Sequence, residues 1–293
     1  MLKKFINGFC MALADSVPGV SGGTVAFILG FYDDFIGSIH NLLFERKEKQ
    51  KQALYYLCKL GIGWVTGMLI AVTILSSAFE NHIYFVSSLF IGFVTASIPY
   101  ILWQEKTAIK DHYGNIVFAV IGAIIVIGIT YFNQSSLLTG IQLNQFSVPL
   151  AIYVFVAGMI AISAMFLPGI SGSTLLLIFG LYLPVISGIK SLLHLQLAYF
   201  PMLCIFGFGV IVGAASVVKG IRYCLLTYRS QTMYMILGLM IGSLYAIVMG
   251  PATLDVPAKP VSFASFQWIA FILGIAVVIF LQLAGNKKQM KEG

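Results

Sequence analysis

The stretch PGVSGGTVAFILGFY at residues 18–32 recurs as PGISGSTLLLIFGLY at residues 168–182. The two copies are identical at 8 of 15 positions when they are aligned at an offset of 150. Pro, Gly, Ser, Thr and Tyr make up most of the identities, whereas chance likeness between apolar segments would favour Leu, Ile and Val. We infer an internal duplication whose distinctive part is a helix-breaking loop inside hydrophobic sequence.

Composition places the chain in a membrane. Its 293 residues are 59% hydrophobic and only 9% charged, with a mean hydropathy of +0.97. A soluble domain of this composition would leave too much apolar surface in water. The net charge of +7 does not indicate nucleic-acid binding, because the basic residues lie in short loops between hydrophobic segments, as membrane orientation requires. The sequence therefore predicts a polytopic membrane protein whose surroundings are membrane lipids.

The duplication extends beyond the motif, because six further positions, four of them glycines, match at an offset of 146. Each half holds five hydrophobic segments. In the first half these are approximately residues 5–17, 21–40, 54–79, 83–103 and 115–132, and in the second half 147–167, 171–189, 198–218, 232–249 and 266–284. We therefore divide one integral membrane domain into repeat one, residues 1–145, and repeat two, residues 146–293.

The two segments around the first motif are short for membrane crossings. A helix needs about 20 apolar residues to cross a bilayer. Residues 5–17 stop at a proline, and the next run soon meets Asp33 and Asp34. We expect a re-entrant hairpin over residues 5–40, with its loop buried in protein. A matching hairpin is expected over residues 147–189, where the longer arms are also compatible with full spans.

Three single crossings follow each hairpin, and because three is odd the second repeat begins on the opposite face. The two repeats are then inverted relative to one another. If the chain starts inside, 15 of its 17 lysines and arginines lie on the cytoplasmic side, and only Lys190 and Lys259 lie outside. The sequence thus predicts an all-α membrane protein with both termini in the cytoplasm.

The N-terminal segment resembles a secretory signal, because two lysines and an apolar run precede Ala12-Leu13-Ala14. Residues 158–167, however, hold the same place before the second motif in mid-chain. We therefore expect the N-terminal segment to remain in the mature protein.

The motif loop has the chemistry of an anion site. Proline ends the preceding helical arm, glycines allow close backbone approach, and Ser or Thr can cap the next helix. Free N–H groups and hydroxyls at a helix N-terminus suit a phosphate. The candidate phosphate-binding residues are Pro18, Gly19, Ser21, Gly22, Gly23 and Thr24 with Pro168, Gly169, Ser171, Gly172, Ser173 and Thr174.

A second interpretation of the same residues is packing, because small residues let membrane helices approach closely. Two copies brought together from opposite faces favour the site, as in secondary transporters. No Walker lysine follows the glycines, and the histidines fit no metal pattern, so we expect no nucleotide, metal or other cofactor.

Three charged residues are further candidates. Asp15 is the carboxylate beside the first motif, and it either couples transport to protons or sodium or holds the hairpin by bonding backbone N–H groups. Arg222 and Arg229 lie at a cytoplasmic helix end, where they either steer a lipid phosphate or only orient the chain.

Three stretches together resemble the PopT-type polyprenyl-phosphate transporters, formerly a family of unknown function. They are ADSVPGVSGGTVAFILGFY, FLPGISGSTLLLIFGLY and the basic stretch that leads into GLMIGSLYAI. The resemblance covers almost the whole chain, and it implies recycling of undecaprenyl phosphate from the outer to the inner leaflet of a bacterial plasma membrane. The chain departs from the family pattern at Leu183, where an acidic residue is expected, and at Tyr245, where arginine is expected.

Three functions compete. A lipid-phosphate flippase working by alternating access and a transporter or channel for a small soluble anion both use helix-terminus anion sites. A membrane enzyme needs a nucleophile or metal with an acid or base, and only Asp15 accompanies either motif. We therefore expect a transporter without catalytic residues.

Overall fold

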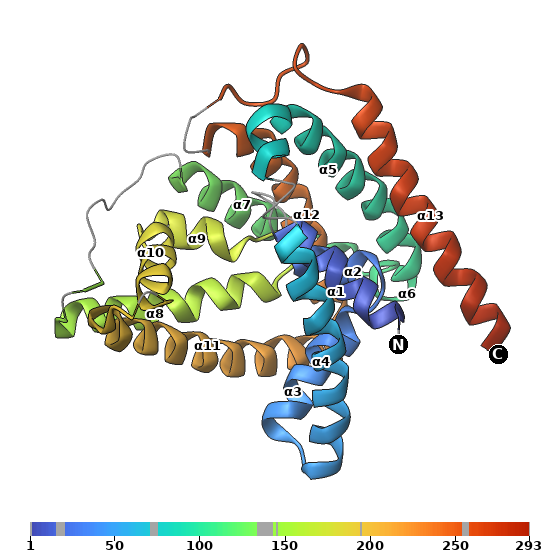
Figure 1. Cartoon of the computed structure of the whole chain (residues 1–293). Helices are drawn as coiled ribbons and strands as arrows, with labels where there is room; N and C mark the ends of the chain where they lie inside the picture. Colours follow the sequence, from blue (N-terminus) through green and yellow to red (C-terminus); the bar gives the residue numbers. More distant parts are fainter. Residues whose placement is uncertain are drawn as a thin grey trace.

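The computed structural model describes residues 2–15, 21–70, 76–133, 143–144, 146–193, 195–253 and 258–292. Every regular element in these ranges is helical (Figure 1). The first half holds α1 (Leu2–Asp15), α2 (Gly22–Ile28), α3 (Tyr32–Phe44), α4 (Lys47–Ile70), α5 (Ser76–Gln104), α6 (Lys106–Ile109), η2 (Tyr113–Asn115) and α7 (Ile116–Asn133). The second half holds α8 (Val148–Phe166), α9 (Gly172–Ile178), α10 (Tyr182–Leu193), η3 (Leu197–Tyr199), α11 (Phe200–Thr227), α12 (Arg229–Met249), η4 (Gly250–Thr253) and α13 (Trp268–Glu292).

Six helical stretches in the described part are long and apolar enough to cross a membrane. They are Lys47–Ile70, His82–Gln104, Tyr113–Tyr131, Val148–Phe166, Leu197–Thr227 and Arg229–Ala252. By contrast, α1 has only 14 residues and spans roughly 21 Å of a hydrocarbon core about 30 Å thick. The chain is therefore an all-helical, multi-pass membrane protein, and α8, with 19 residues, is long enough to span where α1 is not.

Four helix pairs make the most extensive contacts. In each half the first helix packs along a long one, α1 on α4 and α8 on α11. The other two pairs join the halves, α5 with α13 and α7 with α12. Figure 1 shows α13 running beside α5, with the start of α1 and the end of α13 on the same side of the molecule. Two helix pairs, each with one helix from either half, therefore hold the halves together.

Glycines bring these helices into backbone contact at matching places. A Cβ at Gly63 would overlap the carbonyl of Phe5, and a Cβ at Gly209 would overlap that of Phe155. The α5–α13 and α7–α12 pairs also come into backbone contact at glycines. Between α5 and α13, a Cβ at Gly92 would overlap the carbonyl of Phe271, and a Cβ at Gly274 that of Leu89. Between α7 and α12, a Cβ at Gly238 would overlap the carbonyl of Ala119, and a Cβ at Gly122 that of Met235. Close approach through small residues is how membrane helices associate, and each half uses it at corresponding positions.

The second arm of each hairpin is broken at a glycine, whereas continuous segments were expected over residues 21–40 and 171–189. Gly30 has φ +69° and Gly180 has φ +62°. At the first break Phe31 N donates to Ala26 O and Gly30 N to Phe27 O, and the same bonds recur 150 residues later. This pattern ends a helix with a left-handed glycine. The result is a seven-residue helix inside each motif, α2 and α9.

Candidate functional site

The first motif contacts the second motif through two hydroxyls. The Thr24 Oγ1 atom accepts from Gly169 N at 2.8 Å, and Ser21 Oγ donates to Leu167 O at 3.2 Å. The two hydroxyl oxygens lie 3.1 Å apart, and both side chains are 1% exposed. Two segments about 145 residues apart in sequence are therefore joined at the loops that the duplication singled out.

The donor and acceptor roles in this cluster can be assigned. Because Ser21 O–H donates to the Leu167 carbonyl, the bond between the hydroxyls must use the Thr24 proton. The order is then Gly169 N–H to Thr24 O–H to Ser21 O–H to Leu167 C=O. Ser21 also accepts from Thr24 N at 3.2 Å as the N-cap of α2. We call these bonds the inter-motif relay.

Two further contacts seat the first hairpin on the end of α8. The Tyr32 hydroxyl, buried at the start of α3, donates to Phe166 O at 2.9 Å. A Cβ added at Gly23 would lie 3.0 Å from the same carbonyl. The carbonyls at the end of α8 have no partners in their own helix, so the first hairpin supplies the donor. Tyr32 was not among the candidates, although it is identical in both copies of the motif.

Asp15 lies between the two arms of the first hairpin. Its Oδ1 accepts from Gly22 N at 2.6 Å, and its Oδ2 accepts from Trp64 Nε1 at 2.9 Å. A Cβ at Gly22 would meet this carboxylate at 2.7 Å. Asp15 thus ties the end of α1 to the start of α2 and to α4, the contact expected of a carboxylate that holds the hairpin together. Trp64 was not anticipated, because nothing in the local sequence relates it to residue 15.

The second motif also begins a seven-residue helix, but its side-chain contacts differ from those of the first. Helix α8 ends at Phe166, two residues before Pro168, and Ser171 is the N-cap of α9 without a side-chain cap bond. Gly169 has φ +89°, and a Cβ there would overlap the Leu239 carbonyl of α12. Gly172 faces Ala161 O, which its Cβ would meet at 2.7 Å.

Three of the candidate residues are not placed in detail. Thr174 is half-buried, whereas the Ser173 side chain and residues Pro18 and Gly19 lie outside the described part of the structure. Within the described residues no group of three or more His, Cys, Asp or Glu side chains is arranged to hold a metal ion.

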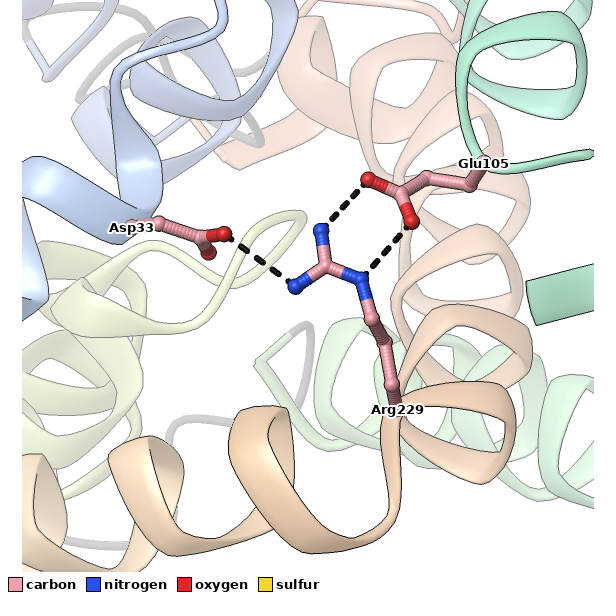
Figure 2. A network of polar contacts seen from close by, with 3 residues as sticks. All are labelled: Asp33, Glu105 and Arg229. Atoms are coloured by element: carbon pink, nitrogen blue, oxygen red, sulfur yellow. Dashed lines mark hydrogen bonds and ion pairs between the residues drawn. The ribbon is translucent and has the colours of Figure 1, made fainter. Parts of the chain in front are cut away.

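Arg229, the first residue of α12, contacts two carboxylates, those of Asp33 on α3 and of Glu105 between α5 and α6 (Figure 2). Its Nε and Nη2 donate to the two carboxylate oxygens of Glu105 at 2.9 and 2.7 Å, and its Nη1 lies 3.2 Å from Asp33 Oδ2. The Glu105 side chain is only 12% exposed, whereas that of Asp33 is 55% exposed. A bidentate pair whose carboxylate is nearly buried is the stronger contact, so Arg229 mainly holds Glu105, directly after α5, to the start of α12. One cation with two carboxylates leaves this cluster a formal charge of −1.

Arg222, in contrast, has neutral partners. Its Nη1 lies 2.9 Å from His40 Nδ1 and 2.8 Å from Asn41 Oδ1, both near the end of α3. Burial, and then the Arg222 charge, lower the pKa of His40. Because a guanidinium only donates, His40 Nδ1 must be the unprotonated acceptor. Arg229 is therefore paired with carboxylates, whereas Arg222, for which the same two roles were expected, bonds neutral groups.

Residues 11–265 match the family described as "Undecaprenyl phosphate translocase-like". The polyprenyl-phosphate transporter of Staphylococcus aureus is 37% identical over 291 residues, which cover 95% of this chain and 96% of that protein. The polyprenyl-phosphate transporter of Vibrio cholerae is 32% identical over 253 residues, covering 83% of this chain and 76% of that protein. No solved structure matches the chain.

Proposed function

The chain belongs to the undecaprenyl phosphate translocase-like family, and on that premise we propose that it returns undecaprenyl phosphate from the outer to the inner leaflet of a bacterial plasma membrane. An ionised headgroup cannot cross hydrocarbon unaided, because burying a bare charge is very costly. The protein must therefore supply polar groups that replace water around the phosphate.

The observation that carries the proposal is the inter-motif relay. Gly169 N–H, Thr24 O–H and Ser21 O–H are three adjacent donors that now satisfy one another and one carbonyl. A phosphate oxygen between the motifs can accept from the same three groups, so binding exchanges hydrogen bonds and leaves no buried donor unpaired. We assign the phosphate to this place, with the glycines and hydroxyls of both motifs around it. Neutral donors also permit release, which a buried cation would slow.

Inverted repeats are the second part of the proposal. The matching helix pairs and glycine contacts support two equivalent halves, repeat one over residues 1–145 and repeat two over residues 146–293. Halves related by inversion have inward-open and outward-open states of similar energy, which alternating access needs. In this scheme the hairpins over residues 5–40 and 147–189 start from opposite faces, and both termini are cytoplasmic.

The orientation has a direct test. In a background without Cys10, Cys58, Cys204 and Cys224, single cysteines replace Lys110 and Lys259, both exposed. A membrane-impermeant thiol reagent applied to intact cells is expected to label Lys259→Cys, and Lys110→Cys only after permeabilisation. Labelling of both positions from the same side would rule out the inverted arrangement.

Asp15 is our candidate for ion coupling, through proton or sodium binding that releases Gly22 N or Trp64 Nε1. The bond to Gly22 N joins the two arms of the first hairpin, and the bond to Trp64 Nε1 joins the hairpin to α4. Replacing Asp15 by Asn keeps one acceptor and removes the charge. We expect Asp15→Asn to transport without dependence on an imposed pH or sodium gradient, and an unchanged gradient dependence would exclude this role.

Transport itself is tested in liposomes that contain undecaprenyl phosphate. Headgroup exposure in each leaflet is followed with and without a pH or sodium gradient. We expect wild-type protein to equilibrate the leaflets far faster than empty vesicles do. Equal exchange in both, together with saturable flux of a soluble anion, would replace the lipid by a small anion as substrate.

A further inference from the structure

Arg222 lies at the junction of α11 and α3 with its charge uncompensated. Its bonded partners are the neutral atoms His40 Nδ1 and Asn41 Oδ1, and both contact the same nitrogen, Nη1. No ion pair to Arg222 occurs among the described residues, whose three salt bridges involve Lys49 and Arg229. The guanidinium is thus held in place at one nitrogen, while Nε and Nη2 carry donors that can face an anion.

The charged groups around this junction are predominantly positive. Lys219, one turn before Arg222 on α11, is exposed, with its Nζ 5.9 Å from the centre of the Phe44 ring. Glu45 is the nearby carboxylate that acts on His40, and it is already paired with Lys49 at 3.3 Å. Arg222 and Lys219 therefore have no carboxylate partner among the residues that the structure describes. The Arg229 cluster, with its two carboxylates, would repel an anion instead.

Apolar side chains are exposed beside these cations. Phe44 and Leu43 at the end of α3 are 47% and 39% exposed, and Tyr223 and Leu226 on α11 are 58% and 76% exposed. Tyr223 and Leu226 belong to a stretch that is long and apolar enough to cross a membrane, so a lipid's hydrocarbon chain can contact this surface while its phosphate contacts the cations. An inorganic ion would make no use of the apolar surface.

This junction is connected to the motifs through α3. Tyr32 at the start of α3 bonds the carbonyl of Phe166, and His40 follows eight residues later on the same helix, roughly 12 Å along its axis. Figure 1 shows the end of α11 approaching α3, with which it is in contact. An anion bound to Arg222 would therefore lie next to α3, the helix whose first residue contacts Phe166, one residue before the relay carbonyl of Leu167.

We propose that Arg222 and Lys219 form a receiving site for the phosphate monoester of a prenyl lipid, separate from the two motifs, with His40 and Asn41 as positioning residues for the guanidinium. The site rests on the proposed function for its ligand class. It adds a location where the headgroup is held before or after it passes the motifs. It also assigns different roles to the two arginines, a ligand group for Arg222 and a structural tie for Arg229.

The test is binding of farnesyl phosphate to the full-length protein in detergent, with farnesol and inorganic phosphate as parallel ligands. Arg222→Gln is expected to weaken farnesyl phosphate binding by about tenfold or more, as expected for loss of a charge-assisted contact. Arg222→Lys keeps the charge without the planar guanidinium, and its affinity for farnesyl phosphate is expected to lie between those of wild type and Arg222→Gln. Lys110→Gln, which removes an exposed cation elsewhere, should bind as wild type does.

Each other outcome contradicts the site. Wild-type affinity in Arg222→Gln, or an equal loss in Lys110→Gln, would reduce Arg222 to general surface charge. Inorganic phosphate that competes at the same concentration as farnesyl phosphate would make this a free-phosphate site. If Arg222→Gln does not fold, Arg222→Lys must still show the loss. The liposome assay separates the two claims, since wild-type protein that binds without transporting refutes the function, and Arg222→Gln that transports and binds normally refutes only the site.

Discussion

Replacing Gly169 by valine is expected to remove most of the folded protein from the membrane. Gly169 has φ +89°, a conformation that a β-branched residue avoids, and its added Cβ would overlap the Leu239 carbonyl of α12. Backbone strain and forced overpacking together cost roughly 2–6 kcal/mol. That is a large share of the about 5–15 kcal/mol by which proteins are usually stable. The amount and melting temperature of purified protein measure the effect.

Two glycines provide controls for this prediction. Gly128 lies in α7 with nothing within 4 Å of an added Cβ, so Gly128→Val should accumulate normally. Gly22 lacks the positive φ of Gly169, and its added Cβ would meet a side chain, the Asp15 carboxylate, where that of Gly169 would overlap backbone. Gly22→Ala should therefore cost less than Gly169→Val. Normal accumulation of Gly169→Val would mean that the second motif does not pack against α12 as described.

These glycines also show how far the sequence could predict the site. The duplication identified both motifs, and the sequence predicted that Ser or Thr would cap the next helix, a position that Ser21 occupies in α2. That the motifs meet was an inference from symmetry. The actual partners, Leu167 O and Gly169 N, are backbone groups, and no residue type indicates which carbonyl or amide a distant hydroxyl will reach.

The charged residues were less predictable for a similar reason. Glu105 and Arg229 are 124 residues apart, and in the sequence each is only a charge next to an apolar segment. Orientation in the membrane explains such charges equally well, so the pairing needed the helix packing. The breaks at Gly30 and Gly180 did have a signal, since both glycines are identical in the two copies. A single glycine in an apolar run is also tolerated within a helix, and the segments were therefore expected to be continuous.

Replacing Thr24 by valine is expected to lower undecaprenyl phosphate transport by about tenfold or more while the protein still folds. Valine has nearly the shape of threonine but lacks the hydroxyl, so the packing of α2 is kept. The change removes one donor to the phosphate, and a hydrogen bond to a charged group contributes about 1.5–3 kcal/mol. It also leaves the buried Gly169 N–H without its partner. Transport in liposomes and affinity for farnesyl phosphate measure the loss of the donor. The melting temperature of the purified protein measures the effect of the unpaired N–H on folding.

Two other variants separate the hydroxyl from the methyl group and from threonine in general. Thr24→Ser restores the donor and should recover most of the transport. Thr130→Val removes a buried hydroxyl that donates to the Val126 carbonyl of its own helix, and it should transport as wild type does. If Thr24→Val folds and transports normally, the phosphate does not pass between the motifs at this residue. If Thr24→Val fails to fold and Thr24→Ser does not, the hydroxyl serves only to join the two motifs. The phosphate would then require other donors, and Arg222 would be the first to test.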